Sequence, residues 1–180
     1  MGYHLDIISV FVVGAVIGSF LNVCIHRMPK NKSIVFPSSH CPKCNKSLYW
    51  YDNIPVLSYV MLLGRCRFCR ERISLRYPLV EMLTALVLTA LFIVFGMTPK
   101  FFAYSIMTCA LIAAAFVDLE IQEIPDEISL GGLAAGLALS LMFPSIIGQA
   151  NRMHALLGSL AGAVSGFGSI FIMKMLGTLM

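Results

Sequence analysis

The sequence predicts an all-α polytopic membrane protein with about five transmembrane helices and one small polar loop subdomain. Of its 180 residues, 58% are hydrophobic and only 12% are charged, which is too apolar for an ordinary soluble domain of this length. The apolar residues gather in runs close to the roughly 20 residues that a helix needs to cross a bilayer. The polar residues, by contrast, concentrate in a single stretch, residues 26–77.

Five apolar runs are long enough to be considered as spans. They cover residues 5–25, 78–96, 101–118, 128–147 and 154–176. We interpret the first run as a permanent span, because a removable signal would have basic residues before it and this run instead carries Asp6. The predicted organisation is therefore a first transmembrane helix (1–25), a loop (26–77), and four further helices within 78–180.

The distribution of basic residues predicts which side of the membrane the loop occupies. Ten of the 13 Lys and Arg residues lie between the first and second spans: Arg27, Lys30, Lys32, Lys43, Lys46, Arg65, Arg67, Arg70, Arg72 and Arg76. The positive-inside bias places this segment in the cytoplasm, and Asp118–Glu127 then falls on the same side. The bias already accounts for these charges, so we expect membrane lipids as partners and no nucleic acid.

Four cysteines in the loop predict a metal site. Cys41 and Cys44 form one Cys-x-x-Cys pair, Cys66 and Cys69 form another, and 21 residues separate the two pairs. This pattern is typical of structural zinc sites, in which four thiolates surround one ion. Two disulfides are the alternative, which a reducing cytoplasm disfavours. His40, which precedes Cys41, is an alternative ligand.

Small residues recur at four-residue spacing in three predicted spans, and such spacing favours close approach of helices in lipid. We interpret them as packing faces. They are Gly14 and Gly18, Gly132 and Gly136, and Gly158, Gly162 and Gly166.

An acidic stretch follows the third span. Residues 117–128 hold five of the nine Asp and Glu residues, and the first, Asp118, ends a long apolar run, where an ionised group is costly. Pro125 is expected to break the helix and make a short turn at the membrane surface. Two interpretations remain open from the residues alone: a solvated turn that caps two helices, or a functional site.

Several motifs together resemble the type IV prepilin peptidase family. They are Gly18-Ser-Phe-Leu-Asn-Val-Cys-Ile-His-Arg-Met-Pro29, the two Cys-x-x-Cys pairs, Asn53-Ile-Pro55 with Ser58-Tyr59, Gly64-Arg-Cys66, Arg76-Tyr-Pro-Leu-Val-Glu81, and Asp118 followed by Ile124-Pro125-Asp126. The resemblance covers residues 14 to 170. It implies an intramembrane aspartyl endopeptidase of the bacterial inner membrane that removes the basic leader of prepilins and pseudopilins on the cytoplasmic face. It also implies an N-methyltransferase that uses S-adenosylmethionine.

The resemblance implies that Asp118 is the first of two catalytic aspartates. The family carries the second in a Gly-x-Gly-Asp motif, which these residues lack, since Gly166-Phe-Gly-Ser169 has serine in the last place. We expect residues 1–180 to be the front of a longer protein and to be inactive as a peptidase alone. Asp126 is not assigned the missing role, because the family pattern admits Asn there. Glu81 is interpreted first as a charge at a helix N-terminus and second as a site residue.

A second function class remains open. The chain is alternatively a non-catalytic membrane scaffold whose zinc loop docks a cytoplasmic partner. In that case the cysteines are needed and Asp118 is dispensable.

Overall fold

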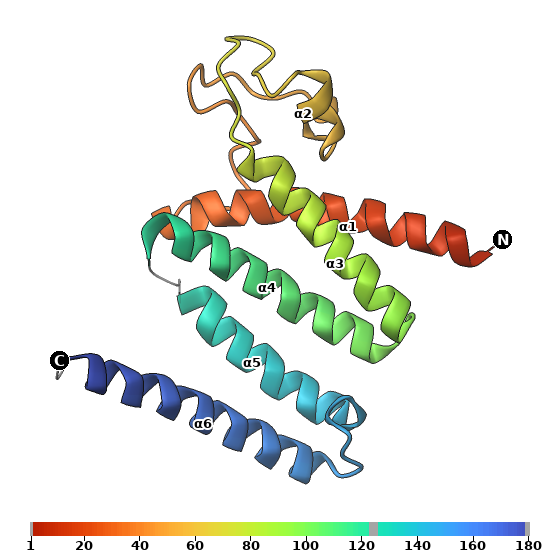
Figure 1. Ribbon diagram of the computed structural model, residues 1–180, viewed down its shortest axis with the longest axis vertical. Helices are drawn as coiled ribbons and strands as arrows, with labels where there is room; N and C mark the ends of the chain where they lie inside the picture. Colours follow the sequence, from red (N-terminus) through yellow and green to blue (C-terminus); the bar gives the residue numbers. More distant parts are fainter. Residues whose placement is uncertain (1, 123–125, 179–180) are drawn as a thin grey trace. The chain divides into compact units, whose positions relative to one another are not determined.

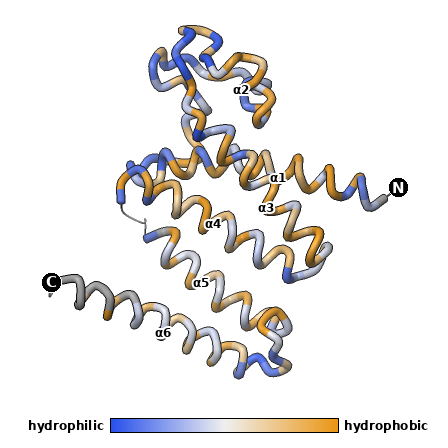
Figure 2. Tube along the Cα trace, in the orientation of Figure 1, coloured by the Kyte–Doolittle hydropathy of each residue, from blue (hydrophilic) through white to orange (hydrophobic). Residues whose placement is uncertain are grey.

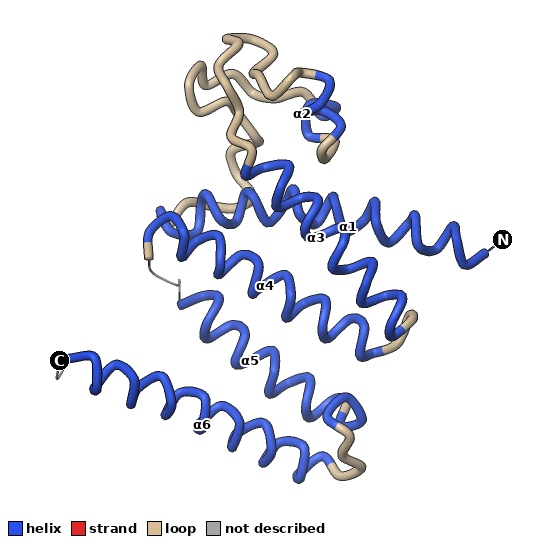
Figure 3. The backbone as a smooth tube through the Cα atoms, in the orientation of Figure 1, coloured by secondary structure: helices blue, strands red, loops and turns tan. Residues whose placement is uncertain are grey.

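The computed structural model describes residues 2–122 and 126–178, and within these residues it contains helices and no strand (Figures 1 and 3). The long helices are α1 (Gly2–Arg27), α3 (Arg76–Phe95), α4 (Pro99–Ile121), α5 (Asp126–Met142) and α6 (Arg152–Thr178). Short helices are η1 (Met28–Lys30), η2 (Trp50–Asn53), α2 (Leu57–Met61) and η3 (Pro144–Ile147). The chain divides into two compact units, Met1–Pro125 and Asp126–Met180.

Helices α1, α3 and α4 are each long and apolar enough to cross a membrane, as expected for the first three spans. Figure 2 shows that apolar residues follow these helices whereas the segment between α1 and α3 is mixed and largely polar. Large apolar side chains such as Val12, Val16 and Leu86 are more than half exposed. In water such surfaces would be unfavourable, so their exposure agrees with a lipid environment.

Close packing of α1 on α3 organises the first unit. A Cβ atom added at Gly14 would lie 2.8 Å from the Cα of Ala85, and one added at Gly18 would lie 2.6 Å from the Cα of Glu81. Only glycine permits backbones to approach this closely, which confirms the predicted packing face on α1. A small core, formed by Val10, Leu88, Phe92 and Phe101, joins α1, α3 and α4 further along.

The connection between α3 and α4 makes these two helices antiparallel neighbours. Helix α3 ends at Phe95 and is capped by Gly96, which adopts a φ of +59°, and α4 begins with Pro99. The C-terminal end of α4 therefore returns to the end of the unit where α3 begins. An ion pair between Arg76 on α3 and Glu120 on α4 joins these two ends.

In the second unit, α5 packs against α6. The helix in the predicted span 128–147 is shorter than expected, because α5 ends at Met142 and Pro144 begins the separate helix η3. The predicted packing faces on α5 and α6 show no comparable close approach among the described residues: outside its own helix backbone, a Cβ atom added at any of these glycines meets no atom within 4 Å. Ser169 lies within α6, where its hydroxyl donates to the carbonyl of Gly166 at 2.8 Å.

Candidate functional site

The two Cys-x-x-Cys pairs form knuckles with the same backbone geometry. In the first, the N–H of Cys41 donates to Lys46 at 3.0 Å and the N–H of Asn45 donates back to Cys41 at 2.9 Å. In the second, the equivalent bonds join Cys66 to Glu71 at 2.8 Å and Arg70 to Cys66 at 3.0 Å. Asn45 and Arg70 both adopt a positive φ, which turns each knuckle back on itself. The fold thus presents four thiols from two equivalent turns.

The four thiols lie close enough together to share one metal ion. The Sγ atoms of Cys41, Cys44, Cys66 and Cys69 all lie within 4.8 Å of one another, and those of Cys41 and Cys69 are 3.8 Å apart. Zinc–sulfur bonds of about 2.3 Å in a tetrahedron place neighbouring sulfurs about 3.8 Å apart. A disulfide requires about 2.05 Å, so the geometry fits a shared ion and not two bridges. His40 is not in this group, and its Nδ1 contacts the carbonyl oxygen of Ser38.

The two thiols of the second knuckle have pKa values shifted in opposite directions. The backbone N–H of Glu71 lowers the pKa of Cys69, but desolvation and hydrogen bonds with the other three thiols raise it overall to about 11. The backbone N–H of Cys69 hydrogen-bonds to the Cys66 sulfur and lowers the pKa of that thiol to about 7. A thiol with a lowered pKa is more readily deprotonated, and the thiolate is the form that ligates a metal.

Side chains outside the knuckles hold the loop in shape. Arg67, between the second pair of cysteines, forms a forked contact with the buried Asp52 of η2, with its Nη2 2.7 Å and its Nε 3.1 Å from Oδ1. Lys46 of the first knuckle lies over the ring of Phe68 in the second, 5.0 Å from its centroid. Tyr49 also packs on Phe68, whereas Trp50 is 79% exposed.

Asp118 lies in α4 and does not join the cysteines. The helix continues to Ile121, one turn beyond the predicted end, and the carbonyl of Asp118 accepts the N–H of Gln122 at 2.8 Å. Its side chain is exposed, and neither ion pair in the part of the chain that the structure describes involves it. The predicted break at Pro125 lies outside the described residues. Asp126, at the start of α5, is likewise exposed.

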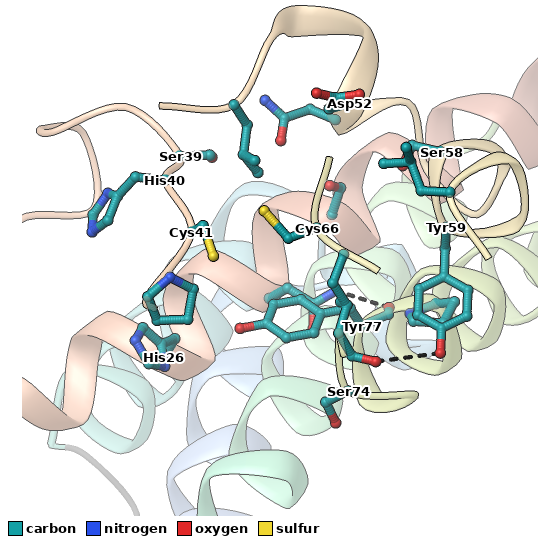
Figure 4. A pocket seen from close by; sticks show the side chains of 18 of the residues that line it. His26, Ser39, His40, Cys41, Asp52, Ser58, Tyr59, Cys66, Ser74 and Tyr77 are labelled. Carbon is teal, nitrogen blue, oxygen red and sulfur yellow. Dashed lines mark hydrogen bonds between the residues drawn. The ribbon is translucent and has the colours of Figure 1, made fainter. Parts of the chain in front are cut away.

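A cavity of about 420 Å³ lies between α1, the cysteine loop and the start of α3 (Figure 4). Cys41 and Cys66 line it, together with His26 of α1 and Tyr77 of α3. Figure 4 also shows the hydroxyl of Tyr59 donating to the carbonyl of Ile73, at 3.3 Å, beside this cavity.

Two polar residues line the cavity wall, and the sequence did not predict that they would lie together. Glu81 is the sixth residue of α3, is only 8% exposed, and accepts the N–H of Val56 at 2.7 Å. It is therefore a buried acceptor and not a charge at the helix N-terminus, which corrects the sequence interpretation. Asn22 of α1 is 3% exposed and donates to the carbonyl of Tyr77 at 2.9 Å. For Asn22, the sequence did contain a signal: a polar amide inside an apolar run is unusual and often functional.

Two family models match the chain in succession. Residues 12–95 match the bacterial peptidase A24 N-terminal domain, and residues 105–179 match the type IV leader peptidase family. The first match covers α1, the cysteine loop and α3, and the second covers most of α4 with Asp118, followed by α5 and α6.

Several relatives of described function are similar over most of this chain. The prepilin leader peptidase/N-methyltransferase of Myxococcus xanthus is 42% identical over 170 residues, which cover 94% of this chain and 48% of the relative. The type 4 prepilin-like proteins leader peptide-processing enzyme of Escherichia coli is 42% identical over 144 residues, 70% of this chain and 54% of the relative. The prepilin leader peptidase/N-methyltransferase of Klebsiella pneumoniae is 34% identical over 173 residues, 92% of this chain and 74% of the relative. The chain thus spans about half the length of the first two relatives. No solved structure matches the chain significantly.

Proposed function

The chain belongs to the prepilin leader peptidase/N-methyltransferase family, and from this we propose that it acts in an intramembrane aspartyl endopeptidase that removes the basic leader of type IV prepilins and pseudopilins. The reaction takes place at the cytoplasmic face of the bacterial inner membrane. The same protein then methylates the new N-terminal amine with S-adenosylmethionine.

Asp118 is the proposed catalytic residue of this chain. The observation that supports it is position: Asp118 is exposed near the end of α4, at the same end of the α1, α3 and α4 unit as the cysteine loop. A peptide that approaches this face meets a carboxylate that no other side chain neutralises by an ion pair among the described residues.

The proposed chemistry requires a second carboxylate. One carboxylate takes a proton from the attacking water while the other, kept protonated by its neighbour's charge, donates a proton to the peptide carbonyl oxygen. The family supplies the partner in a Gly-x-Gly-Asp motif that residues 1–180 do not contain. We therefore propose that residues 1–180 alone do not cleave prepilin.

The proposed role of Cys41, Cys44, Cys66 and Cys69 is to hold one structural zinc ion. All four ligand positions are then filled by protein, so the ion has no open position for water or substrate and performs no chemistry. It stabilises a loop that has few buried apolar residues of its own.

The test is Asp118→Asn in the protein expressed from its complete reading frame, with prepilin cleavage measured in membranes. The substitution keeps the size of the side chain and removes its ability to exchange a proton. Cleavage should fall by about 10²- to 10⁴-fold, the usual contribution of a general acid or base. Asp126→Asn is the matched control and should cleave normally.

Two outcomes would contradict this assignment. Normal cleavage by Asp118→Asn would show that Asp118 is not catalytic, and if loss of the cysteines nevertheless stopped processing, the scaffold function would be favoured. Cleavage by residues 1–180 alone would show that no second carboxylate outside them is required.

A further inference from the structure

The cavity beside the cysteine cluster has a helix wall rich in unused hydrogen-bond acceptors. Glu81 accepts the N–H of Val56 through Oε2 and also hydrogen-bonds the side chain of Ser19, which leaves an ionised carboxylate with room for about two further hydrogen bonds. The side-chain oxygen of Asn22, Oδ1, is fully buried and has no hydrogen-bond partner among the described residues. Ser19, one turn before Asn22 on α1, lines the same wall.

An orphaned buried acceptor is costly unless a ligand satisfies it. Leaving a buried polar atom without a partner costs about 1–3 kcal/mol, and a buried carboxylate without a countercharge costs more. The Nδ2 of Asn22 is already committed to the carbonyl of Tyr77, so its amide orientation leaves only the acceptor oxygen free. The wall therefore selects a group that donates hydrogen bonds or carries positive charge.

The basic side chains around the cavity do not supply that group. Arg27 donates to the carbonyls of Ser33 and Pro37, at 3.0 and 2.7 Å, and Arg67 pairs with Asp52. Lys43 and Arg72 line the cavity from the loop, where they are exposed. They offer contacts for an anionic group on the same ligand, opposite in charge to Glu81.

We propose that this cavity binds a small ligand whose cationic group, an ammonium or a sulfonium, is held by Glu81 and the amide oxygen of Asn22. A volume of about 420 Å³ is within the usual range for small-molecule sites. Two sources of such a group follow from the proposed N-methylation, on which this choice of ligands rests. One is the sulfonium of S-adenosylmethionine, whose carboxylate would suit Lys43 and Arg72, and the other is the new α-amine of the cleaved peptide.

The test is direct binding, measured by calorimetry on residues 1–180 in detergent with zinc present. Four probes separate the two sources: S-adenosylmethionine against its neutral thioether product S-adenosylhomocysteine, and a short peptide with a free α-amine against its N-acetylated form. In one of these pairs the cationic form should bind about tenfold tighter or more than the neutral form. Glu81→Gln should reduce that preference to less than about twofold, because it removes the charge and keeps the shape.

Two further variants keep the test informative. Glu120→Gln makes the same change in a carboxylate that does not line the cavity. This variant should therefore prefer the cationic probe over the neutral probe as strongly as the wild type does. Ser58→Leu fills the cavity from α2 without altering Glu81 or Asn22, and it should abolish binding even if Glu81→Gln fails to fold.

The proposal is overturned if folded, zinc-loaded wild type binds none of the four probes at about 1 mM, a concentration at which dissociation constants up to about 1 mM are detected. It is equally overturned if neither pair shows a preference for the cationic form, or if folded Glu81→Gln or Ser58→Leu binds as the wild type does. Binding does not require cleavage, so failure of the Asp118 assignment would leave these results unaffected.

Discussion

Equivalent residues of the two knuckles in the cysteine loop are separated by the same number of positions, which shows how the four-cysteine cluster is built. Cys41 and Cys66 occupy the same place in their knuckles, as do Asn45 and Arg70, whose positive φ closes each turn. The isolated bridges His40–Ser47 and Arg65–Arg72 flank the two knuckles in the same manner. The sequence predicted this cluster because the Cys-x-x-Cys spacing alone determines how two thiols approach one ion.

Substitution of one cysteine tests the metal at the scale of the residue. Cys66→Ser should reduce the zinc content from about one per chain to near zero, because the serine hydroxyl is a poor substitute for a thiolate in a closed tetrahedral site. Elemental analysis of the purified protein measures this. Cys109→Ser, in α4 and outside the cluster, should retain zinc. Wild-type protein without zinc, or with iron instead, would contradict the assignment.

The cavity wall could not be predicted from local sequence in the same way. Asn22 and Glu81 are 59 positions apart, and they share a wall only because α1 and α3 pack closely. A Glu five residues after the first residue of a helix gives no local sign that it will bond to Val56 of a distant loop. Spacing predicts sites built within one turn, whereas this wall depends on tertiary packing.

At the scale of helices, the glycine pattern predicted one packing face and left two without a partner. Gly14 and Gly18 lie against the backbone of α3, whereas a Cβ atom added at the glycines of α5 and α6 would meet no atom within 4 Å among the described residues outside its own helix backbone. The pattern identifies a surface that permits close approach. It does not identify the partner, and for this reason only the face on α1 was confirmed.

Gly18→Ala should destabilise the packing of α1 on α3. Its new Cβ would lie 2.6 Å from the Cα of Glu81, an atom of the backbone that cannot rotate away. Overpacking of this kind costs about 1–3 kcal/mol, measurable as an earlier unfolding transition in detergent. Gly158→Ala is the matched control: its Cβ meets nothing, so stability should change by less than about 1 kcal/mol. Equal effects of the two substitutions would argue against the close approach.

At the scale of the whole molecule, apolar run length predicted the helices well and their ends less well. Helices α1, α3 and α4 extend two to three residues beyond several of the predicted ends, because polar residues such as Glu120 continue a helix that hydropathy alone would stop. The reverse happened in α5, where Pro144 ends an apolar run that hydropathy would continue. Hydropathy measures compatibility with lipid, whereas backbone chemistry decides where a helix ends.

The order of helices in the first unit leads to a prediction of sidedness. The turn at Gly96–Thr98 and the cysteine loop lie at opposite ends of α3, and most basic residues are in or next to the loop. The positive-inside bias therefore places the loop in the cytoplasm and Met97 outside. With a maleimide that cannot cross the membrane, Met97→Cys should be labelled in cells whose inner membrane is intact. Ser38→Cys, in the loop, should be labelled only after the membrane is opened.

Ser38 and Met97 are both exposed, so a cysteine at either position that fails to react is shielded by the membrane and not by burial within the protein. Labelling of the unsubstituted protein in intact cells is the background to subtract. If Ser38→Cys reacted in intact cells and Met97→Cys did not, the orientation would be inverted. The cysteine loop and the end of α4 that carries Asp118 would then both face away from the compartment where leader cleavage is proposed, and the proposed function would lose its geometric support.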